Sequence, residues 1–143
     1  MNAIEQLQTE SACRALIVRA AGCADNNDAR ALADLFTEDA RLVRPGGDPL
    51  LGREAIFAAY AKRPADRMTR HLVTNTELEM LADGRVRAMS YALVIAGSRN
   101  DEATPQGRKA SSCQMGEFHD TLVLTGQGWR IAQREASFVL YVP

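Results

Sequence analysis

The feature that most constrains the fold of this chain is a change of hydrophobic periodicity at Pro64. Before Pro64, apolar residues recur at the three- and four-residue spacing of amphipathic helices. After it come four strand-like runs with no helical spacing between them, at about 67–81, 85–97, 110–124 and 129–142. Helices followed by a run of strands are typical of an α+β domain, with the strands joined as an antiparallel meander.

Local signals give the expected limits of the helices. Asn26-Asn27 ends the first helix, and Asp28 is a candidate N-cap for the second. A short strand at 38–43 is expected between the second and third helices, and Asp83-Gly84 predicts a tight hairpin after the first long strand. The three helices are expected at about Ile4–Ala24, Ala29–Phe36 and Arg53–Lys62.

The predicted strands exceed the usual strand length, so their sheet has to coil or bulge strongly. In the run 85–97, bulky residues alternate with mostly small ones, which suits a curved sheet covered by helices on one side. We therefore expect a cone-shaped, strongly curved antiparallel sheet with three N-terminal helices that enclose a pocket. The length of 143 residues predicts one domain, spanning 1–143.

Composition excludes several classes of function. The net charge of −1, without a basic patch, argues against nucleic acid or an anionic membrane as a partner. No signal pattern or membrane-spanning run occurs, so a cytoplasmic location is expected. With two histidines and three scattered cysteines, the sequence predicts neither a zinc site nor another metal or cofactor.

Asp25 and His71 are the most informative polar residues. Helical spacing places Asp25 in line with Ala21, Val18 and Ile17, so its carboxylate is expected to point where the apolar stripe points. Burial there is costly unless a polar group meets the carboxylate. His71 opens a strand-like run that is suited to meet it, and a carboxylate paired with an imidazole can transfer protons.

Both residues also have a purely structural interpretation. Asp25 could cap the helix end or bond the backbone of the Asn26-Asn27 turn. A lone His71 is more often a hydrogen-bonded core residue than a base. The residues alone leave these alternatives open.

Five segments of the chain, in this order, resemble the nuclear transport factor 2-like superfamily, specifically its SnoaL-like (polyketide-cyclase-like) branch. The resemblance extends from about residue 10 to residue 140 and implies the curved cone fold. Its members include isomerases, dehydratases, cyclases, epoxide hydrolases and non-catalytic subunits, so the fold does not name a function. The segments are Asp25–Ala40, Leu51–Ile56, Arg70–Asn75, Gly116–Asp120 and Gly128–Arg134.

Two enzymes of this superfamily, scytalone dehydratase and lindane dehydrochlorinase, use an aspartate at the end of the first helix and a histidine on the next long strand. The resemblance implies that His71 removes a carbon-bound proton and that Asp25 orients it. Arg134 falls where the dehydrochlorinase has an arginine. The dehydratase's tyrosine before the aspartate and its second histidine, near residues 93–97, have no counterpart here. A cofactor-free lyase, isomerase or cyclase is implied.

The β subunits of ring-hydroxylating dioxygenases also share three of these segments. They are mainly structural, so a non-catalytic ligand-binding or oligomer-building module is the alternative. Epoxide hydrolysis normally needs an Asp-Arg-Asp arrangement, which cannot be placed in this sequence. A homodimer through the open face of the sheet is expected, because long strands with apolar residues on both faces need cover.

The expected ligand is a small, largely apolar organic molecule. Arg134, which shares strand parity with Arg130 and Ala132, could orient a substrate oxygen or pair with Asp25, Glu117 or Asp120. Without a bulge, Asn75 lies on the same strand face as His71. His119 belongs either to a polar pocket wall or to a solvated face. Further candidates for the core or the pocket lining are Phe36, Met68, Met89, Tyr91 and Met115.

Overall fold

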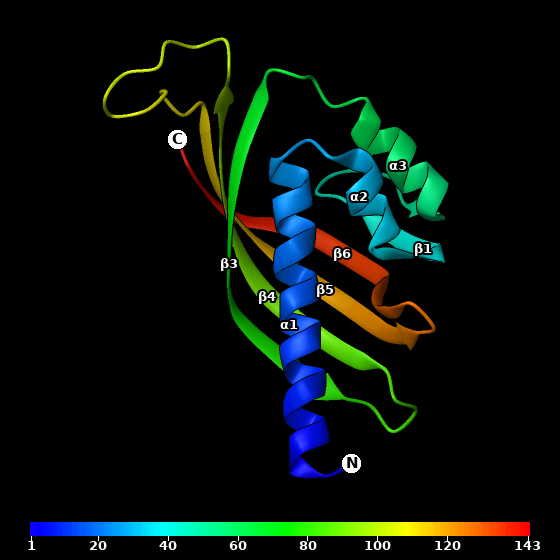
Figure 1. Ribbon diagram of the computed structural model, residues 1–143. Helices are drawn as coiled ribbons and strands as arrows, with labels where there is room; N and C mark the ends of the chain where they lie inside the picture. The colour runs from blue at the N-terminus through cyan, green and yellow to red at the C-terminus, as the bar shows by residue number, and fades with distance from the viewer.

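The computed structural model describes residues 1–143 and contains three helices and six strands (Figure 1). Each predicted helix and long strand is present, with ends that differ by a few residues. A two-residue strand, β2, was not predicted. The helices are α1 (Ala3–Asp25), α2 (Ala29–Asp34) and α3 (Arg53–Ala61). The strands are β1 (Phe36–Val43), β2 (Leu50–Leu51), β3 (Arg67–Met80), β4 (Val86–Ser98), β5 (Ser112–Thr125) and β6 (Gly128–Val142).

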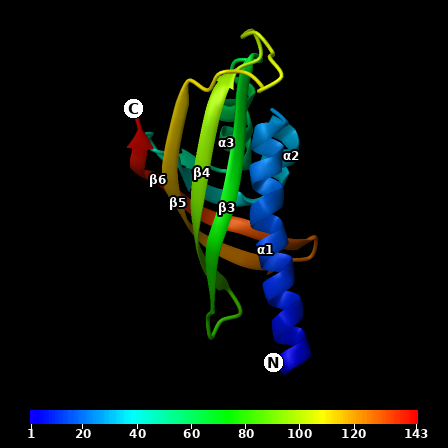
Figure 2. The same cartoon turned by 90° about the vertical axis from the view of Figure 1, so that its left-hand side faces the viewer.

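All six strands form one curled sheet in the order β2-β1-β6-β5-β4-β3. The four long strands β3 to β6 make the predicted antiparallel meander, whereas β1 pairs with β6 in parallel. The helices lie on the concave side of the sheet, and Figure 2 looks toward the opposite side, which no helix covers. The fold is therefore the expected α+β cone.

Helix α1 begins with a capping box, in which Asn2 and Glu5 each accept a hydrogen bond from the other's backbone N–H. Its buried face includes Ile17 and Ala21, as the periodicity predicts. Val18, which was placed on the same stripe, is instead 58% exposed. It follows Ile17 by one residue, which turns its side chain away from the sheet by about 100°.

The second helix is shorter than predicted because the sheet takes over its last residues. Leu35 is the C-cap of α2, and Phe36 is the first residue of β1. The Leu35 carbonyl accepts a 2.9 Å hydrogen bond from the N–H of Ile131 on β6, and Phe36 is in register with Ile131. Parallel pairing with β6 thus competes with another helical turn. Helical spacing in the sequence gives no information about this pairing.

The inner face of β4 carries small side chains, and its outer face carries large ones. Ala88, Ser90, Ala92 and Ala96 are buried under the helices, whereas Tyr91 on the other face is 38% exposed. Small residues on the concave face leave room for the helices and for a cavity. The alternation therefore predicts which face of the sheet is covered.

Three bulges change the side-chain parity of the long strands, one in β3 and two in β6, and the second of those in β6 leaves Val139 unpaired. In β3 the register shifts between Thr74 and Glu77, where Asn75 adopts a positive φ of 54°. In β6 the register shifts beside Ala132, which has no partner between the paired residues Ile131 and Gln133. Each bulge moves the following residues to the other face.

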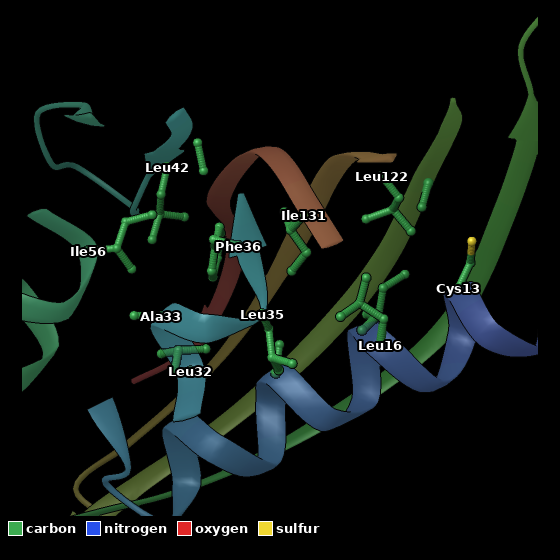
Figure 3. Close-up of a cluster of buried hydrophobic side chains, with 14 of the residues drawn as sticks. Cys13, Leu16, Leu32, Ala33, Leu35, Phe36, Leu42, Ile56, Leu122 and Ile131 are labelled. Carbon is green, nitrogen blue, oxygen red and sulfur yellow. The ribbon is translucent and has the colours of Figure 1, made fainter. Parts of the chain in front are cut away.

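The hydrophobic core lies between α1, α2, α3 and the inner sheet face (Figure 3). Phe36, Ile17, Leu42, Ile56, Leu122 and Ile131 are its largest fully buried apolar side chains. Four residues of this core, Ala20, Leu32, Phe36 and Leu42, also line a cavity. None of the helices has both the length and the apolar composition to span a lipid bilayer.

Candidate active site

A cavity of about 440 Å³ lies between the helices and the concave face of the sheet. This volume is within the range of small-molecule sites. Most of its wall is apolar, with Leu32, Phe36, Val94 and Phe118 among the lining residues. Polar and charged side chains interrupt this wall, and these decide what chemistry the cavity can support.

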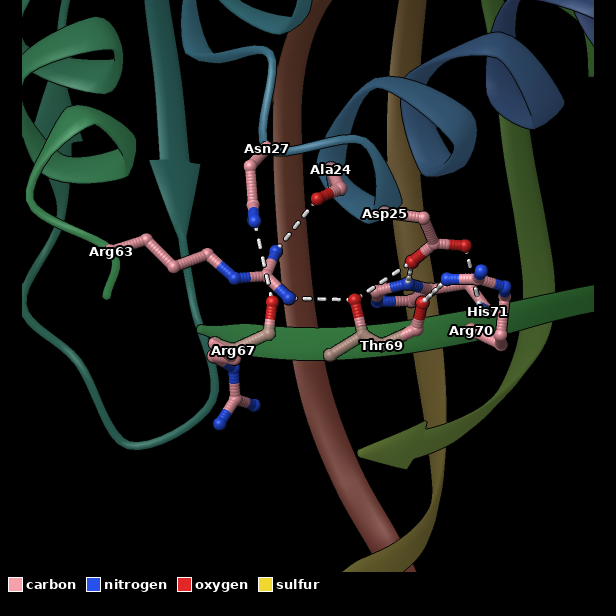
Figure 4. Close-up of polar contacts among 8 residues, drawn as sticks. All are labelled: Ala24, Asp25, Asn27, Arg63, Arg67, Thr69, Arg70 and His71. Carbon is pink, nitrogen blue, oxygen red and sulfur yellow. Dashed lines mark hydrogen bonds and ion pairs between the residues drawn. The ribbon is translucent and has the colours of Figure 1, made fainter. Parts of the chain in front are cut away.

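Asp25 is the last residue of α1 and faces β3 (Figure 4). Its carboxylate accepts three hydrogen bonds from that strand. The Thr69 hydroxyl donates to Oδ1 at 2.8 Å, the His71 backbone N–H donates to Oδ2 at 3.0 Å, and the His71 ring Nδ1 lies 2.5 Å from Oδ1. The carboxylate is therefore met by polar groups, as its burial requires.

His71 meets Asp25 through Nδ1, and its other ring nitrogen, Nε2, has no partner in the protein. The His71 side chain is only 16% exposed and lines the cavity. An acceptor at Nδ1 favours the tautomer that carries its hydrogen there. Nε2 is then an unprotonated nitrogen that is available to accept a proton.

Arg63, which follows α3, holds the Asp25 side chain in place through Thr69 (Figure 4). Its Nη2 donates to the Thr69 hydroxyl at 2.6 Å, and its Nη1 donates to the carbonyl of Ala24 at 2.8 Å. Burial lowers the pKa of Arg63, and the positive charge of Arg67 lowers it further. The Arg63-Thr69-Asp25 chain ties the end of α1 to both α3 and β3.

Arg134 forms a buried ion pair with Asp120, one of the alternatives considered for it. Its Nε and Nη2 donate to the two carboxylate oxygens of Asp120 at 2.7 and 2.8 Å, and its guanidinium stacks 4.0 Å from the Phe118 ring centroid. The side chain also lines the cavity, and its Nη1 has no protein partner. Burial alone would lower the pKa of Arg134, but Asp120 more than offsets this and raises it.

The expected parity of Arg134 was wrong. Arg134 points to the same buried face as Ile131, not to the opposite one, because the bulge at Ala132 shifts the alternation by one residue. This bulge is what brings Arg134 into register with Asp120 and into the cavity wall.

Tyr60 on α3 is a polar lining residue that the sequence did not single out as functional. Its hydroxyl has no hydrogen-bond partner in the protein. Burial raises the pKa of Tyr60, although the nearby charges of Arg134, Arg44 and Arg63 offset part of the rise. A neutral phenol at this position can donate a hydrogen bond to a ligand. Helical spacing in the sequence could not distinguish Tyr60 from the core residues on the same side of α3.

The other candidates fall into two groups. Phe36 is both a core residue and part of the cavity wall. The structure does not bring the remaining six residues to the cavity. Register pairs such as Met89 with His119 lie on the outer face, since their neighbours Ala88 and Asp120 are buried inside. The six are Met68, Asn75, Met89, Tyr91, Met115 and His119.

Two of these six placements have identifiable causes. Asn75 sits at the bulge of β3, so it does not share the face of His71. His119 is on the solvated face, where its side chain is 55% exposed and bonds Glu117. No group of three or more histidine, cysteine, aspartate or glutamate side chains is arranged to hold a metal ion.

Comparison with known proteins places the chain in a family. The SnoaL-like domain family matches residues 5–135. The chain belongs to the SnoaL-like family. This confirms the resemblance seen in the sequence and agrees with the curled, unclosed sheet. A search of curated proteins finds no match.

Several solved structures have the same fold as this chain. A candidate scytalone dehydratase from Novosphingobium aromaticivorans is 20% identical, with a TM-score of 0.82 over 96% of this chain and 88% of that one. The protein LinA is 19% identical, with a TM-score of 0.83 over 100% and 94%. ActVI-ORFA from Streptomyces coelicolor is 22% identical, with a TM-score of 0.76 over 92% and 97%. At these identities the similarity establishes the fold.

Proposed function

We propose that this SnoaL-like protein is a cofactor-independent enzyme that removes a carbon-bound proton from a small organic molecule in the cavity. The observation that carries the proposal is the contact between His71 and Asp25, which leaves Nε2 of His71 unpaired at the cavity wall. Elimination, isomerisation and cyclisation all begin with such a proton transfer.

In the proposed step, Nε2 of His71 accepts the proton, and the electrons of the C–H bond form a new C=C bond or an enolate. In an elimination the leaving group departs with its bonding pair. Asp25 holds the ring in the required tautomer and stabilises the imidazolium that forms. Asp25 does not take the proton itself.

Arg134 and Tyr60 are the proposed partners of a substrate oxygen. Arg134 offers its free Nη1, while Asp120 holds the other two nitrogens in a fixed plane. Tyr60 offers a neutral hydroxyl from α3. Donors that are already oriented stabilise negative charge as it develops on an oxygen, without reorganisation during the reaction.

The test is hydrogen exchange of small hydroxylated, halogenated or carbonyl-containing cyclic compounds in heavy water, followed by mass spectrometry. His71→Gln is expected to lower the exchange rate by about 10²–10⁴-fold, the usual contribution of a general base. Asp25→Asn is expected to cost nearly as much, because an amide can hold the ring in the wrong tautomer.

His119→Gln is the matched control, because His119 is the only other histidine and lies on the outer face. It is expected to keep the wild-type rate. Loss of activity in the control, or no exchange across a broad panel, would contradict the proposal. The second result would favour the non-catalytic binding module.

A further inference from the structure

The polar part of the cavity wall is basic. Five of the lining residues carry a positive charge, and none is an aspartate or glutamate. The chain as a whole has 17 basic and 18 acidic residues, so this separation of charge is not a consequence of composition. The five are Arg44, Lys62, Arg63, Arg67 and Arg134.

Only one of these five charges is neutralised within the protein. Arg134 is paired with Asp120, whereas Arg44, Lys62, Arg63 and Arg67 form no salt bridge. Arginines elsewhere, such as Arg85 and Arg87, do have carboxylate partners. Of the twelve basic residues outside the cavity wall, four form a salt bridge and eight do not, so the wall is distinguished by having five positive charges and no lining aspartate or glutamate.

Arg63 shows the electrostatic cost of this arrangement most clearly. Two of its nitrogens donate to uncharged oxygens, on Ala24 and Thr69, and its Nε is buried without a partner. Removing a guanidinium from water is unfavourable unless an anion compensates for it. Asp25 is the one carboxylate whose charge acts on Arg63, but it is occupied by hydrogen bonds with Thr69 and His71.

We propose that the ligand of this cavity is an organic anion, with an apolar body held by the aromatic and aliphatic wall and a carboxylate directed toward Arg63. Charge-assisted hydrogen bonds between a guanidinium and a carboxylate are among the strongest polar contacts in proteins. Lys62 and Arg67 are exposed beside Arg63, where their charges would attract the anion to the cavity. This inference deepens the proposed function, because it names the substrate class of the same site.

The test compares the binding of 2-naphthoate with that of 2-naphthamide, which has a similar shape but no charge, by isothermal titration calorimetry. The wild type is expected to bind the carboxylate at least about tenfold more tightly, and added salt is expected to reduce this preference. Arg63→Met is expected to bring the two affinities close together. Equal affinities in the wild type would overturn the proposal.

Because Arg63 also supports Asp25, a second variant avoids its structural role. The double variant Lys62→Gln/Arg67→Gln changes only exposed side chains and is expected to weaken naphthoate binding several-fold, with naphthamide binding unchanged. Arg85→Gln/Arg87→Gln removes the same net charge from the distant β3–β4 hairpin region and is expected to leave both affinities unchanged. An equal loss in both double variants would overturn the proposal.

The binding assay needs no turnover, so the two proposals fail separately. A preference for naphthoate without any exchange in heavy water would support the anion site and contradict the enzyme. Exchange of neutral compounds together with equal affinities for the two probes would support the enzyme and contradict the anion site.

Discussion

The hydroxyl of Thr69 donates a 2.8 Å hydrogen bond to Oδ1 of Asp25, across 44 positions of sequence. The same hydroxyl accepts a hydrogen bond from Nη2 of Arg63. Thr69 is 2% exposed and lies two residues before His71 on β3, so both residues point to the same side of the strand. One strand thus supplies both the histidine and a support for its aspartate.

We expect Thr69→Val to lower the proposed activity without a comparable change in KM, since Thr69 positions Asp25 and is not the base. The loss of a buried hydrogen bond is also expected to reduce the free energy of unfolding by about 1–3 kcal/mol. Thr69→Ser, which keeps the hydroxyl, should recover most of the activity. Steady-state kinetics and urea denaturation give the two measurements.

Thr37→Val is the matched control for this substitution. The Thr37 hydroxyl is buried without a hydrogen-bond partner, so its removal is expected to be neutral or stabilising. If Thr37→Val and Thr69→Val had equal effects, the hydrogen bonds of Thr69 would not be the cause.

The buried ion pair between Arg134 and Asp120 is expected to dominate the response to substitutions at this end of the cavity. Asp120→Asn leaves a buried guanidinium without its anion, so we expect a loss of about 3–5 kcal/mol in the free energy of unfolding. The double variant Asp120→Leu/Arg134→Met removes both charges and should regain much of this loss. Urea denaturation of the single and double variants measures the difference.

The exposed pair of Asp83 and Arg85 provides the comparison for that prediction. Exposed ion pairs contribute little to stability, so Asp83→Asn is expected to cause no measurable loss. Destabilisation of the Asp120→Leu/Arg134→Met variant as severe as that of Asp120→Asn would show that the pair contributes more than its desolvation costs.

Cys13 provides a pH-dependent test of the core. Burial raises the pKa of its thiol from 9.0 to about 11. Below pH 9 the thiol is protonated in both states, and above pH 9 the unfolded chain releases its proton first. The contribution of Cys13 to stability is therefore lost as the pH rises from 9 to 11, by up to about 1.4 kcal/mol per pH unit.

Unfolding of the wild type and Cys13→Ala at a series of pH values from 8 to 10.5 measures this effect. Groups present in both proteins contribute equally to the two pH profiles. The difference in unfolding free energy between the wild type and Cys13→Ala is therefore expected to narrow as the pH rises. Parallel curves would show that the Cys13 thiol is not protected from ionisation by the fold.

The outer face of the sheet carries the predicted dimer contact. Leu72, Leu93, Met115 and Leu140 are successive register partners on β3, β4, β5 and β6, and together they form an apolar row on the outer face of the sheet. Leu72 is 53% exposed and Leu140 is 69% exposed. We expect light scattering at micromolar concentration to give the mass of a dimer.

Leu72→Glu and Leu140→Glu are expected to shift this dimer toward a monomer, because each places a charge in the contact. Leu124→Glu is the control, since Leu124 is 65% exposed but lies near the β5–β6 turn, outside the row. A monomeric wild type, or an equal effect of the control, would contradict the prediction.

The sequence by itself determined the order of helices and long strands, because hydrophobic periodicity and turn residues act over short distances. Helix phase also suggested that Asp25 faces the sheet near His71, but the residues alone left a structural role open for both, and the proposed pairing rested on the family resemblance as well. The same reasoning placed Met89 and Tyr91 in the pocket, although the small residues between them line the covered face of the sheet. The alternation of small and large side chains along β4 was the sequence signal that could have identified the covered face.

Only the tertiary structure decided which polar residues surround Asp25 and His71. It also decided which face of the sheet each residue beyond a bulge points to. The bulges at Asn75 and Ala132 arise from pairing between strands, and each reverses a parity that the sequence alone would continue. Arg63, Thr69 and Tyr60 come together from α3 and β3, whose relative position depends on packing across the whole core. Contacts between distant segments have no local pattern, so they cannot be read from periodicity.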